Sequence, residues 1–482
     1  MDSEQTQLAI TRLNLAPGEV IDGRFELVDC LHLGGMATVW SVKLKDGLPD
    51  EAATGLVMKV PRIQGGDDPA TIVVGFEVEQ MIMPRLSGPH VPAFVARGDF
   101  TRLPYIVMEH IEGETLQALV DQAPLPAEDV VQIGIKVAQA LQALHQQHVV
   151  HLDIKPSNIM FRATGEAVLL DYGLSRHDQL PDLLEEEFAI PLGTGPYMSP
   201  EQVQFKRNDP RSDLFALSVL MYHLATGERP FGHPHSVAGL RKRLYTEPVP
   251  PRAIVPALPA WFQEVLLHGL EVDPDRRYQS AAQLALDLQY PEQIALTERA
   301  ARTRTAGTFR TLGRWFKAMG AEPTQTINTI DQLSRGAIIM VALGVHNHTP
   351  DLDQKLLATV RRILQIEPDA RLACVSVMKT NRIGMDELTD PEGQSLHVKH
   401  LVAIKHWARP LQATLKMDEQ RLTFHVLEAP DTACALVEFA RKNQVDHIVM
   451  GARGSSAMRR YLGSVSAQVV AEADCSVTVV RL

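Results

Sequence analysis

The sequence is poor in cysteine, in long apolar runs and in basic charge. Its 482 residues include four cysteines, none with CxxC spacing. This pattern indicates buried or idle thiols of structural role and disfavours a disulfide framework or a zinc site. No apolar run reaches the roughly 18 to 20 residues that span a bilayer, and no signal peptide opens the chain. The net charge of −11 disfavours a nucleic-acid-binding surface. We therefore expect a cytoplasmic protein with no transmembrane segment and no nucleic-acid partner.

The chain is long enough for several domains, and its patterns change along its length. Short β-rich runs at 25–60 and a helical pattern at 71–86 indicate a small β-rich lobe, and longer helical periods beyond Leu116 indicate a larger helical lobe. After Gly336, apolar runs alternate with helical stretches, which predicts βαβ units and a mostly parallel sheet. We expect a multi-domain protein in which a two-lobed α+β domain precedes an α/β domain. The expected boundaries are 1–23 for an N-terminal extension, 24–290 for the first domain, 291–335 for a basic, threonine-rich linker and 336–482 for the second domain.

Chemistry-bearing residues gather first in HLDIKPSN at 151–158. The strand-like runs IMFRA and EAVLL flank a Thr164-Gly165 turn, and a two-residue hairpin would set Asn158 opposite Asp171. Their side-chain oxygens suit Mg²⁺, which takes its other ligands from water and phosphate. Asp153 can orient and deprotonate a hydroxyl, and Lys155 can neutralise a transferred phosphoryl group. The spacing predicts a phosphotransfer centre.

HLDIKPSN, DYG at 171–173 and SPE at 199–201 occur in an order that resembles the eukaryotic-like (Hanks-type) protein kinases. The resemblance covers residues 24–290. It implies a two-lobed fold, ATP with Mg²⁺ or Mn²⁺ as cofactors, and Ser/Thr residues of proteins as substrates. It also makes Lys59, in LVMK, the ligand of the α and β phosphates, positioned by Glu79 rather than Glu77.

The resemblance further implies an adenine-nucleotide site. LHLGGMATVW at 31–40 resembles the glycine-rich loop, with Gly34, Gly35 and Val39 in matching positions. His32 stands where the family has its first glycine, and Ala37 stands at the third. We expect His32 to stiffen the loop or to weaken ATP binding.

In the hinge, the resemblance makes Met108 the gatekeeper, turns the backbones of Glu109 and Ile111 toward adenine, and lets Glu114 reach the ribose.

Two further features of the resemblance concern the larger lobe. Lys155 together with GTGPYMSPE at 193–201 resembles the serine/threonine branch, in which Thr194 contacts Asp153 and Lys155. Asp213 and Arg277 match structural positions, and Arg277 is expected to pair with Glu201.

One departure from the family concerns control. The family commonly has arginine at the position of Leu152, and that arginine binds a phosphate on the activation segment. Residues 176–193 contain no Ser, Thr or Tyr. We hypothesise that activity does not depend on phosphorylation there. The run Glu185–Glu187 either supplies permanent charge or is simply a solvated loop.

The C-terminal part carries a second glycine pattern. DHIVMGARGSSAMRRYLGSVS at 446–466, with the preceding α/β rhythm, resembles the universal stress proteins, whose motif binds nucleotide. The resemblance makes Gly451, Gly454, Gly463 and Ser464 nucleotide ligands and implies homodimerisation through the last strand. However, the glycines are one residue closer than in the family, and Gly344 replaces an adenine-binding aspartate. Two roles of this glycine pattern therefore remain open: it binds nucleotide, or it forms tight turns that serve only packing.

Alternatives remain for the whole chain and for its linker. A pseudokinase scaffold that binds nucleotide and partners without turnover is the rival to a kinase involved in a stress response. The linker is a solvated connector, or else a pseudosubstrate, membrane-surface or inter-domain contact. Its threonines are predicted autophosphorylation sites, namely Thr297, Thr303, Thr305, Thr308 and Thr311.

Overall fold

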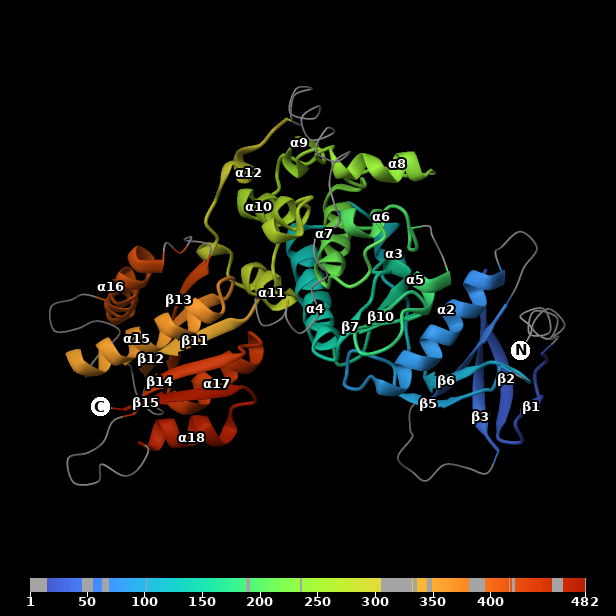
Figure 1. The fold of residues 1–482 in the computed structure, drawn as a ribbon, viewed down its shortest axis with the longest axis horizontal. Coiled ribbons are helices and arrows are strands. Elements are labelled where there is room, and N and C mark those ends of the chain that lie inside the picture. The colour runs from blue at the N-terminus through green and yellow to red at the C-terminus, as the bar shows by residue number, and fades with distance from the viewer. Residues whose placement is uncertain are drawn as a thin grey trace. The chain divides into compact units, whose positions relative to one another are not determined.

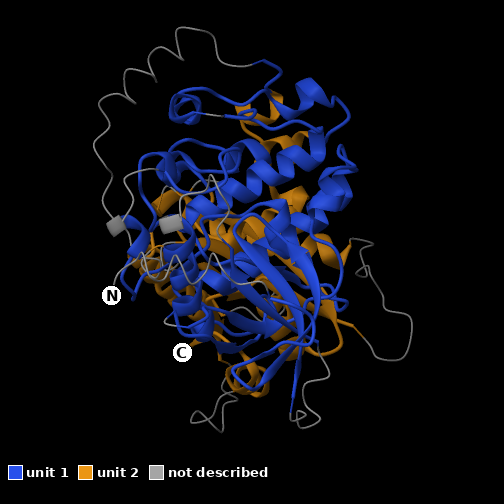
Figure 2. Cartoon of the chain, turned by 90° about the vertical axis from the view of Figure 1, so that its right-hand side faces the viewer, with its two compact units in different colours: residues 1–259, 266–277, 302–330 blue, residues 260–265, 278–301, 331–482 orange. Residues whose placement is uncertain are grey.

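The protein was described from a computed structural model, in which the chain forms two compact units (Figure 2). Unit 1 comprises residues 1–259, 266–277 and 302–330, and unit 2 comprises 260–265, 278–301 and 331–482. No helix in the described part is both long and apolar enough to cross a membrane. The structure describes residues 15–45, 55–62, 69–100, 102–187, 191–234, 236–304, 332, 336–344, 349–380, 395–415, 417, 421–452 and 463–481.

Unit 1 begins with a six-stranded antiparallel sheet in the order β1-β2-β3-β4-β6-β5 (Figure 1). Strand β2 begins with alternating buried and exposed positions and β4 is buried along most of its length, and Phe25, Leu27, Met58 and Val107 fill the core on one face. The long helix α2 lies beside this sheet. The predicted helix at 71–86 is therefore present, although its last turn is a 3₁₀ helix. The elements are β1 (Val20–Ile21), β2 (Phe25–Leu33), β3 (Ala37–Leu44), β4 (Leu56–Pro61), α2 (Pro69–Ile82), η1 (Met83–Arg85), β5 (Phe94–Arg97) and β6 (Ile106–Glu109).

The rest of unit 1 is mainly helical and is built around α7, in which every residue is buried. A helix that is buried on all sides belongs in a core, and its buried polar side chains, such as Ser212 and Asp213, have hydrogen-bond partners. Gly227 ends α7 with φ 74, a left-handed conformation that suits glycine. The elements are α3 (Gln117–Val120), α4 (Ala127–His145), β7 (Val149–Val150), η2 (Pro156–Asn158), β8 (Ile159–Phe161), β9 (Ala167–Leu169), β10 (Arg176–His177), α5 (Leu183–Glu187), α6 (Pro200–Val203), α7 (Arg211–Thr226), α8 (Val237–Arg241), η3 (Lys242–Leu244), α9 (Pro251–Ile254) and η4 (Pro274–Arg276), with α10 (Ala260–Gly269) shared between the units.

Unit 2 contains a five-stranded sheet in the order β13-β12-β11-β14-β15, and every pair of neighbours is parallel. Helices α15 and α16 pack on one face, and α11, α17 and α18 pack on the other. The predicted parallel α/β architecture is confirmed. The elements are α11 (Ala281–Gln289), η5 (Pro291–Gln293), α12 (Glu298–Ala301), β11 (Ile338–Ala342), α15 (Pro350–Ile366), β12 (Arg371–Lys379), α16 (Leu396–Leu415), β13 (Leu422–Ala429), α17 (Thr432–Lys442), β14 (His447–Gly451), α18 (Ser464–Glu472) and β15 (Ser476–Val480).

Helix α11 belongs to the core of unit 2, although it precedes the expected linker. Ala282 and Leu286 are buried in the same apolar cluster as Ile338 on β11. The guanidinium of Arg371 on β12 lies 2.6 Å from the carboxylate of Asp287. The limit of this compact unit therefore does not coincide with the expected boundary at residue 291.

The segment after α11 covers one edge of the sheet. The side-chain amide of Gln293 donates to the carbonyl of Phe424 at 2.9 Å and accepts from the N–H of Phe424 at 2.6 Å. These are the bonds that a neighbouring strand would make. Gln293 therefore closes the β13 edge at this position.

The four cysteines form no disulfide. Cys374 is buried in the core of unit 2, whereas Cys30 and Cys434 are exposed and Cys475 is intermediate. A role in packing therefore holds for Cys374 and not for the two exposed thiols.

Candidate active site

The loop between β7 and η2 holds Asp153 in a dense set of hydrogen bonds. The carboxylate lies 2.6 Å from the Nζ of Lys155 and accepts from the hydroxyl of Thr194 at 2.7 Å and from its N–H at 3.1 Å. The amide of Asn158 donates to the same carboxylate at 3.1 Å. Lys155 also donates to the Thr194 hydroxyl at 3.2 Å, so the expected contacts of Thr194 are present. These bonds fix Asp153 in one orientation. A general base needs such a fixed orientation, because it must receive a proton from a defined position.

The hairpin that precedes Asp171 differs from the prediction by one residue. β8 and β9 pair Ile159 with Leu169, and the N–H of Leu170 donates to the carbonyl of Asn158. The predicted pairing of Asn158 with Asp171 is therefore wrong. The reason is the turn, which has three residues rather than two and places Gly165 at φ 102.

Asp171 still joins the site, because its backbone leaves the strand in an unusual conformation. Its φ of 65 is in the left-handed region, which costs an L-residue about 1 kcal/mol or more. Its carboxylate lies 2.9 Å from the Nζ of Lys59. Partial desolvation by the surrounding protein acts to raise the pKa of Asp171, whose side chain is 46% exposed, but the ammonium of Lys59 lowers that pKa to about 2. Asp171 is therefore ionised at neutral pH.

Lys59 on β4 is held by two carboxylates. Its Nζ lies 2.6 Å from Glu79 on α2 as well as 2.9 Å from Asp171. The structure pairs Lys59 with Glu79, as the resemblance implies, and leaves Glu77 exposed. Burial acts to lower the pKa of Lys59, but the two carboxylates outweigh it and raise that pKa. Burial raises the pKa of Glu79, against the opposing effect of Lys59.

Asn158 and Asp171 can each offer an oxygen to a divalent metal ion. Asp171 is ionised, and 46% of its side chain is exposed. Asn158 is oriented by its amide nitrogen, which donates to the carbonyl of Asp153 at 3.0 Å. This donor set fits Mg²⁺ or Mn²⁺ when phosphate and water supply the other ligands. No cluster of three His, Cys, Asp or Glu side chains that could hold a metal occurs in the described ranges.

The turn between β2 and β3 carries the two predicted phosphate-loop glycines. The N–H of Gly34 donates to the carbonyl of Ala37 at 3.0 Å, and a side chain on Gly35 would meet open space. Val39 on β3 is directly opposite Lys59 on β4. The glycine turn and Lys59 therefore belong to adjoining strands of one sheet.

The hinge residues begin at Glu109, the last residue of β6, and continue toward α3. The N–H of Glu109 donates to the carbonyl of Ala93 at 2.9 Å, so that group is not available to adenine. Its carboxylate pairs with Arg162, which lowers the pKa of Glu109. The side chain of Ile111 is buried, and Glu114 is exposed. No described contact of Glu114 tests its predicted role at the ribose.

Asp213 on α7 holds the backbone of the loop that carries Asp153, at residues 151–158. Its carboxylate accepts from the N–H groups of His151 and Leu152, each at 2.8 Å. His145 contacts the same carboxylate at 2.9 Å, and Gln202 donates to the carbonyl of Leu152 at 2.8 Å. Sequence reasoning found Asp213 from its motif but missed His145 and Gln202.

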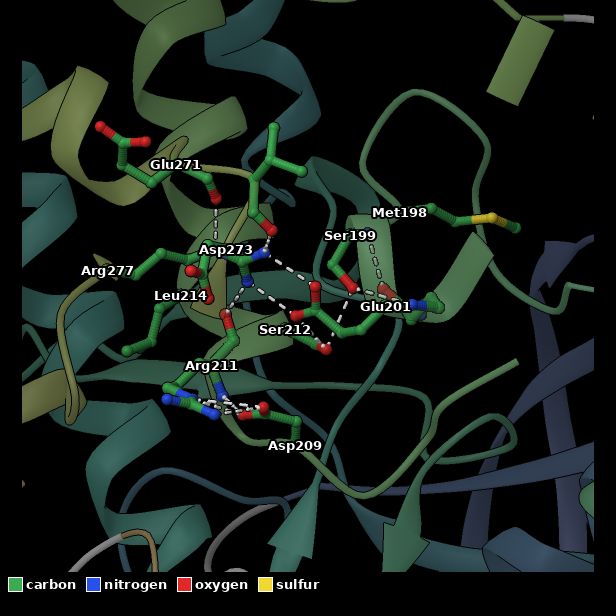
Figure 3. Close-up of polar contacts among 12 residues, drawn as sticks. Met198, Ser199, Glu201, Asp209, Arg211, Ser212, Leu214, Glu271, Asp273 and Arg277 are labelled. Atoms are coloured by element: carbon green, nitrogen blue, oxygen red, sulfur yellow. Dashed lines mark hydrogen bonds and ion pairs between the residues drawn. The ribbon is translucent and has the colours of Figure 1, made fainter. Parts of the chain in front are cut away.

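A buried ion pair links Glu201 on α6, in the SPE motif, to Arg277, which follows η4 in unit 1 (Figure 3). Arg277 forms a fork with Glu201, with N–O distances of 2.6 and 2.7 Å, as expected. Ser212 donates to the same carboxylate at 2.8 Å. Bidentate geometry and extra donors are the conditions under which a buried ion pair is compensated.

The segment 176–193 contains an ionic contact that sequence reasoning missed. Asp182 lies 2.9 Å from the Nε of Arg207 and 3.6 Å from Arg176. Glu185 lies 3.6 Å from Arg176, and its side chain is 59% exposed. No local motif joins Asp182 to Arg207, so only the fold brings them together.

In unit 2, the glycine pattern is partly described. A side chain on Gly451, at the end of β14, would lie 2.9 Å from Leu352 on α15. Gly463 is the N-cap of α18, and Ser464 is the first helical residue. Gly454 lies outside the described residues. Glycine at 451 thus lets the Leu352 side chain pack closely against the end of β14, independently of any ligand.

The comparisons with known proteins match this organisation. Residues 68–290 match the protein kinase domain family, and residues 338–481 match the universal stress protein family. The first match ends inside the 278–301 segment of unit 2.

Individual relatives are named as serine/threonine-protein kinases. PknL of Mycobacterium bovis is 30% identical over 314 residues, which cover 63% of this chain and 76% of that protein. PknB of Mycobacterium tuberculosis is 32% identical over 273 residues, covering 56% of this chain and 43% of PknB. A probable serine/threonine-protein kinase of Clostridium perfringens is 29% identical over the same length, covering 39% of that protein. The chain spans about two fifths of the length of the latter two relatives.

The fold and these matches define a two-domain chain of kinase type. It belongs to the serine/threonine-protein kinase family and carries a C-terminal domain of the universal stress protein family.

Proposed function

We propose that this chain is an active serine/threonine protein kinase that transfers the γ-phosphoryl group of Mg-ATP to protein hydroxyls in the cytoplasm. The observation that carries this proposal is the set of bonds that Lys155, Thr194 and Asn158 make to Asp153. A carboxylate held by three side chains is preorganised for one task.

The residues divide the reaction among them. The substrate hydroxyl oxygen attacks the γ-phosphorus, its proton passes to Asp153, and the bond to the bridging β–γ oxygen breaks with ADP as the leaving group. Lys155 neutralises charge on the transferred group, and Lys59, positioned by Glu79, holds the α and β phosphates. A divalent ion at Asn158 and Asp171 would neutralise charge on the phosphates.

The test is transfer of labelled phosphate from ATP by the full chain, compared with Lys59→Met and Asp153→Asn. We expect Asp153→Asn to reduce transfer at least 100-fold, as the loss of a general base does. Nucleotide binding should survive in this variant. Equal labelling in all three proteins would reject the proposal. Binding of ATP without transfer by the wild-type chain would favour the pseudokinase scaffold.

We also propose that activity needs no phosphate on the activation segment. The pair of Asp182 with Arg207 supports this, because an unmodified carboxylate already neutralises an arginine there. The nearest hydroxyls are occupied: Ser175 is buried and donates to the carbonyl of His151, and Thr194 donates to Asp153. Glu185 adds a weaker contact, and the side chains of Glu186 and Glu187 lie outside the described residues.

For the stress-protein domain we propose homodimerisation through β15. Gln293 occupies the β13 edge at Phe424, and β15 has a single neighbour, β14, among the described strands. An edge strand can pair with a second copy. Sedimentation of the full chain with Val477→Pro, which removes a backbone donor that faces away from β14, should show less dimer than the wild-type chain. An unchanged dimer would reject this route.

Adenine-nucleotide sensing by Gly451, Gly463 and Ser464 remains a second proposal for this domain. Mg-ATP titration of a Lys59→Met chain should reveal it as nucleotide binding that a Gly463→Val change abolishes. A titration that Gly463→Val leaves unchanged would reject it.

A further inference from the structure

The strand register places His32 on the same face of the sheet as Lys59. His32 on β2 is directly opposite Val39 on β3, and Val39 is directly opposite Lys59 on β4. Directly opposed residues of antiparallel strands project their side chains to the same face. The Lys59 side chain on this face reaches Glu79 and Asp171. His32 therefore projects toward the candidate nucleotide site.

The imidazole of His32 lies against the glycine turn. Its Nε2 is 3.1 Å, and its Cδ2 is 3.3 Å, from the position that a Cβ on Gly34 would occupy. The ring thus fills the space beside Gly34 that a glycine at position 32 would leave open. Within the described part of the chain, neither ring nitrogen has a hydrogen-bond partner.

The turn between β2 and β3 has fewer free backbone N–H donors for a phosphate than a turn in which every N–H is unpaired. The N–H of Gly34 is committed to the carbonyl of Ala37 at 3.0 Å. Phosphate recognition by glycine loops depends on backbone donors that point at the anion. A donor on a side chain at the same place can replace the one that the turn consumes.

We propose that His32 is a phosphate-binding residue, whose imidazole N–H donates to the phosphate chain of the adenine nucleotide. This inference rests on the proposed kinase function, because it needs a nucleotide under the turn. It reverses the expectation that a histidine at a glycine position weakens ATP binding. Its chemistry requires a phosphorylated nucleotide and predicts no gain for a bare nucleoside.

The experiment is calorimetric titration of the full chain with Mg-ADP and, separately, with adenosine. We expect His32→Ala to weaken Mg-ADP binding roughly ten- to 100-fold, the effect of losing one hydrogen bond to a charged group, and to leave adenosine binding unchanged. His32→Gln keeps a neutral donor and should restore part of the loss. The matched control is Leu33→Ala, because the neighbouring residue is 63% exposed and alternation places it on the opposite face.

Three results would overturn the inference. Equal or tighter Mg-ADP binding by His32→Ala would show that the ring only obstructs the turn. Equal losses for ADP and adenosine would assign the contact to the nucleoside. Equal losses in His32→Ala and Leu33→Ala would show that the strand, rather than the imidazole, is responsible.

The kinase proposal fails in a distinguishable way. Transfer activity is not the readout, so a wild-type chain that binds Mg-ADP but transfers no phosphate leaves the role of His32 measurable. A wild-type chain that binds no Mg-ADP, with Gly463→Val excluding a contribution from the second domain, overturns both proposals.

Discussion

The carboxylate of Asp213 accepts the backbone N–H of Leu152 at 2.8 Å, and Leu152 has a φ of 63. A branched aliphatic residue in the left-handed region is costly, and such a conformation persists only where its surroundings hold it. The hydrogen bond to Asp213 stabilises this conformation of Leu152. It thereby also fixes the direction of the backbone at the next residue, Asp153. The leucine is buried, so it contributes packing as well as an unusual turn.

We expect Asp213→Asn to loosen the catalytic loop. The amide that replaces one carboxylate oxygen would face a backbone N–H, and leaving a buried donor unsatisfied costs about 1–3 kcal/mol. The free energy of unfolding should fall by that amount, and phosphoryl transfer should fall at least tenfold, while Mg-ADP binding stays within twofold. Urea unfolding and initial transfer rates measure these effects.

The matched control for this change is Asp129→Asn, at an exposed position in the first turn of α4, which should leave transfer unchanged and lower the free energy of unfolding by no more than about 0.3–1 kcal/mol. Normal transfer by Asp213→Asn would show that the loop keeps its shape without this carboxylate.

We expect Asp182→Asn to reduce activity about tenfold, because Arg207 would lose a charged partner in a largely buried place. The two side chains are only 7% and 9% exposed, and removing one member of such a pair leaves an uncompensated charge. Phosphatase treatment of the wild-type chain should leave its rate unchanged. Initial rates with a peptide substrate measure both effects.

Glu185→Gln is the control for this prediction. Its contact is 3.6 Å long and its side chain is 59% exposed, so its loss should change the rate less than twofold. A phosphatase-sensitive wild-type rate, or a larger effect at Glu185 than at Asp182, would contradict the proposal.

The sequence predicted those parts of the site that local spacing determines. Asp153, Lys155 and Asn158 lie on one short loop, and the family resemblance gave Glu79 as the partner of Lys59. The pairing of Asn158 failed because a three-residue turn and a two-residue turn have the same sequence cues around Gly165. A single residue of difference then changes every pair in the hairpin.

Other features could not be read from the sequence, because they depend on contacts between distant segments. Asp182 and Arg207 are 25 residues apart and share no motif. The apolar positions Ala282 and Leu286 of α11 fit a helix in either unit equally well. Only the arrangement of the sheet shows that they pack against β11.

The pair of Arg277 and Glu201 should dominate the stability of the SPE region. Arg277→Met leaves the buried Glu201 without its bidentate partner, and breaking such a pair costs about 3–5 kcal/mol. Adding Glu201→Gln removes the unpaired charge and should recover at least half of the loss. Urea unfolding of the single and double variants measures this coupling, and additive losses would show that the two side chains act independently.

The stability of unit 2 should fall as the solution becomes acidic, because of His425. Its ring lies between Tyr290 and Phe439, with centroid distances of 4.7 and 4.8 Å. Burial, followed by the charge of Arg371, lowers the pKa of His425 from about 6.5 to about 3. The folded state thus excludes a proton that the unfolded chain binds.

The sign follows directly from this lowered pKa. The contribution of neutral His425 is fully present above pH 6.5 and is lost as the pH falls toward 3, by at most about 1.4 kcal/mol per pH unit. His425→Phe should flatten this dependence, while His406→Phe, at an exposed position, should not. Hydrogen exchange of peptides from 421–452, corrected for the intrinsic effect of pH, measures the local stability. A wild-type profile that His425→Phe leaves unchanged would show that another group controls the acid response. The amide of Gln293 lies 3.2 Å from the Nδ1 of His425. In that case, the contact of Gln293 with the sheet edge would not depend on pH.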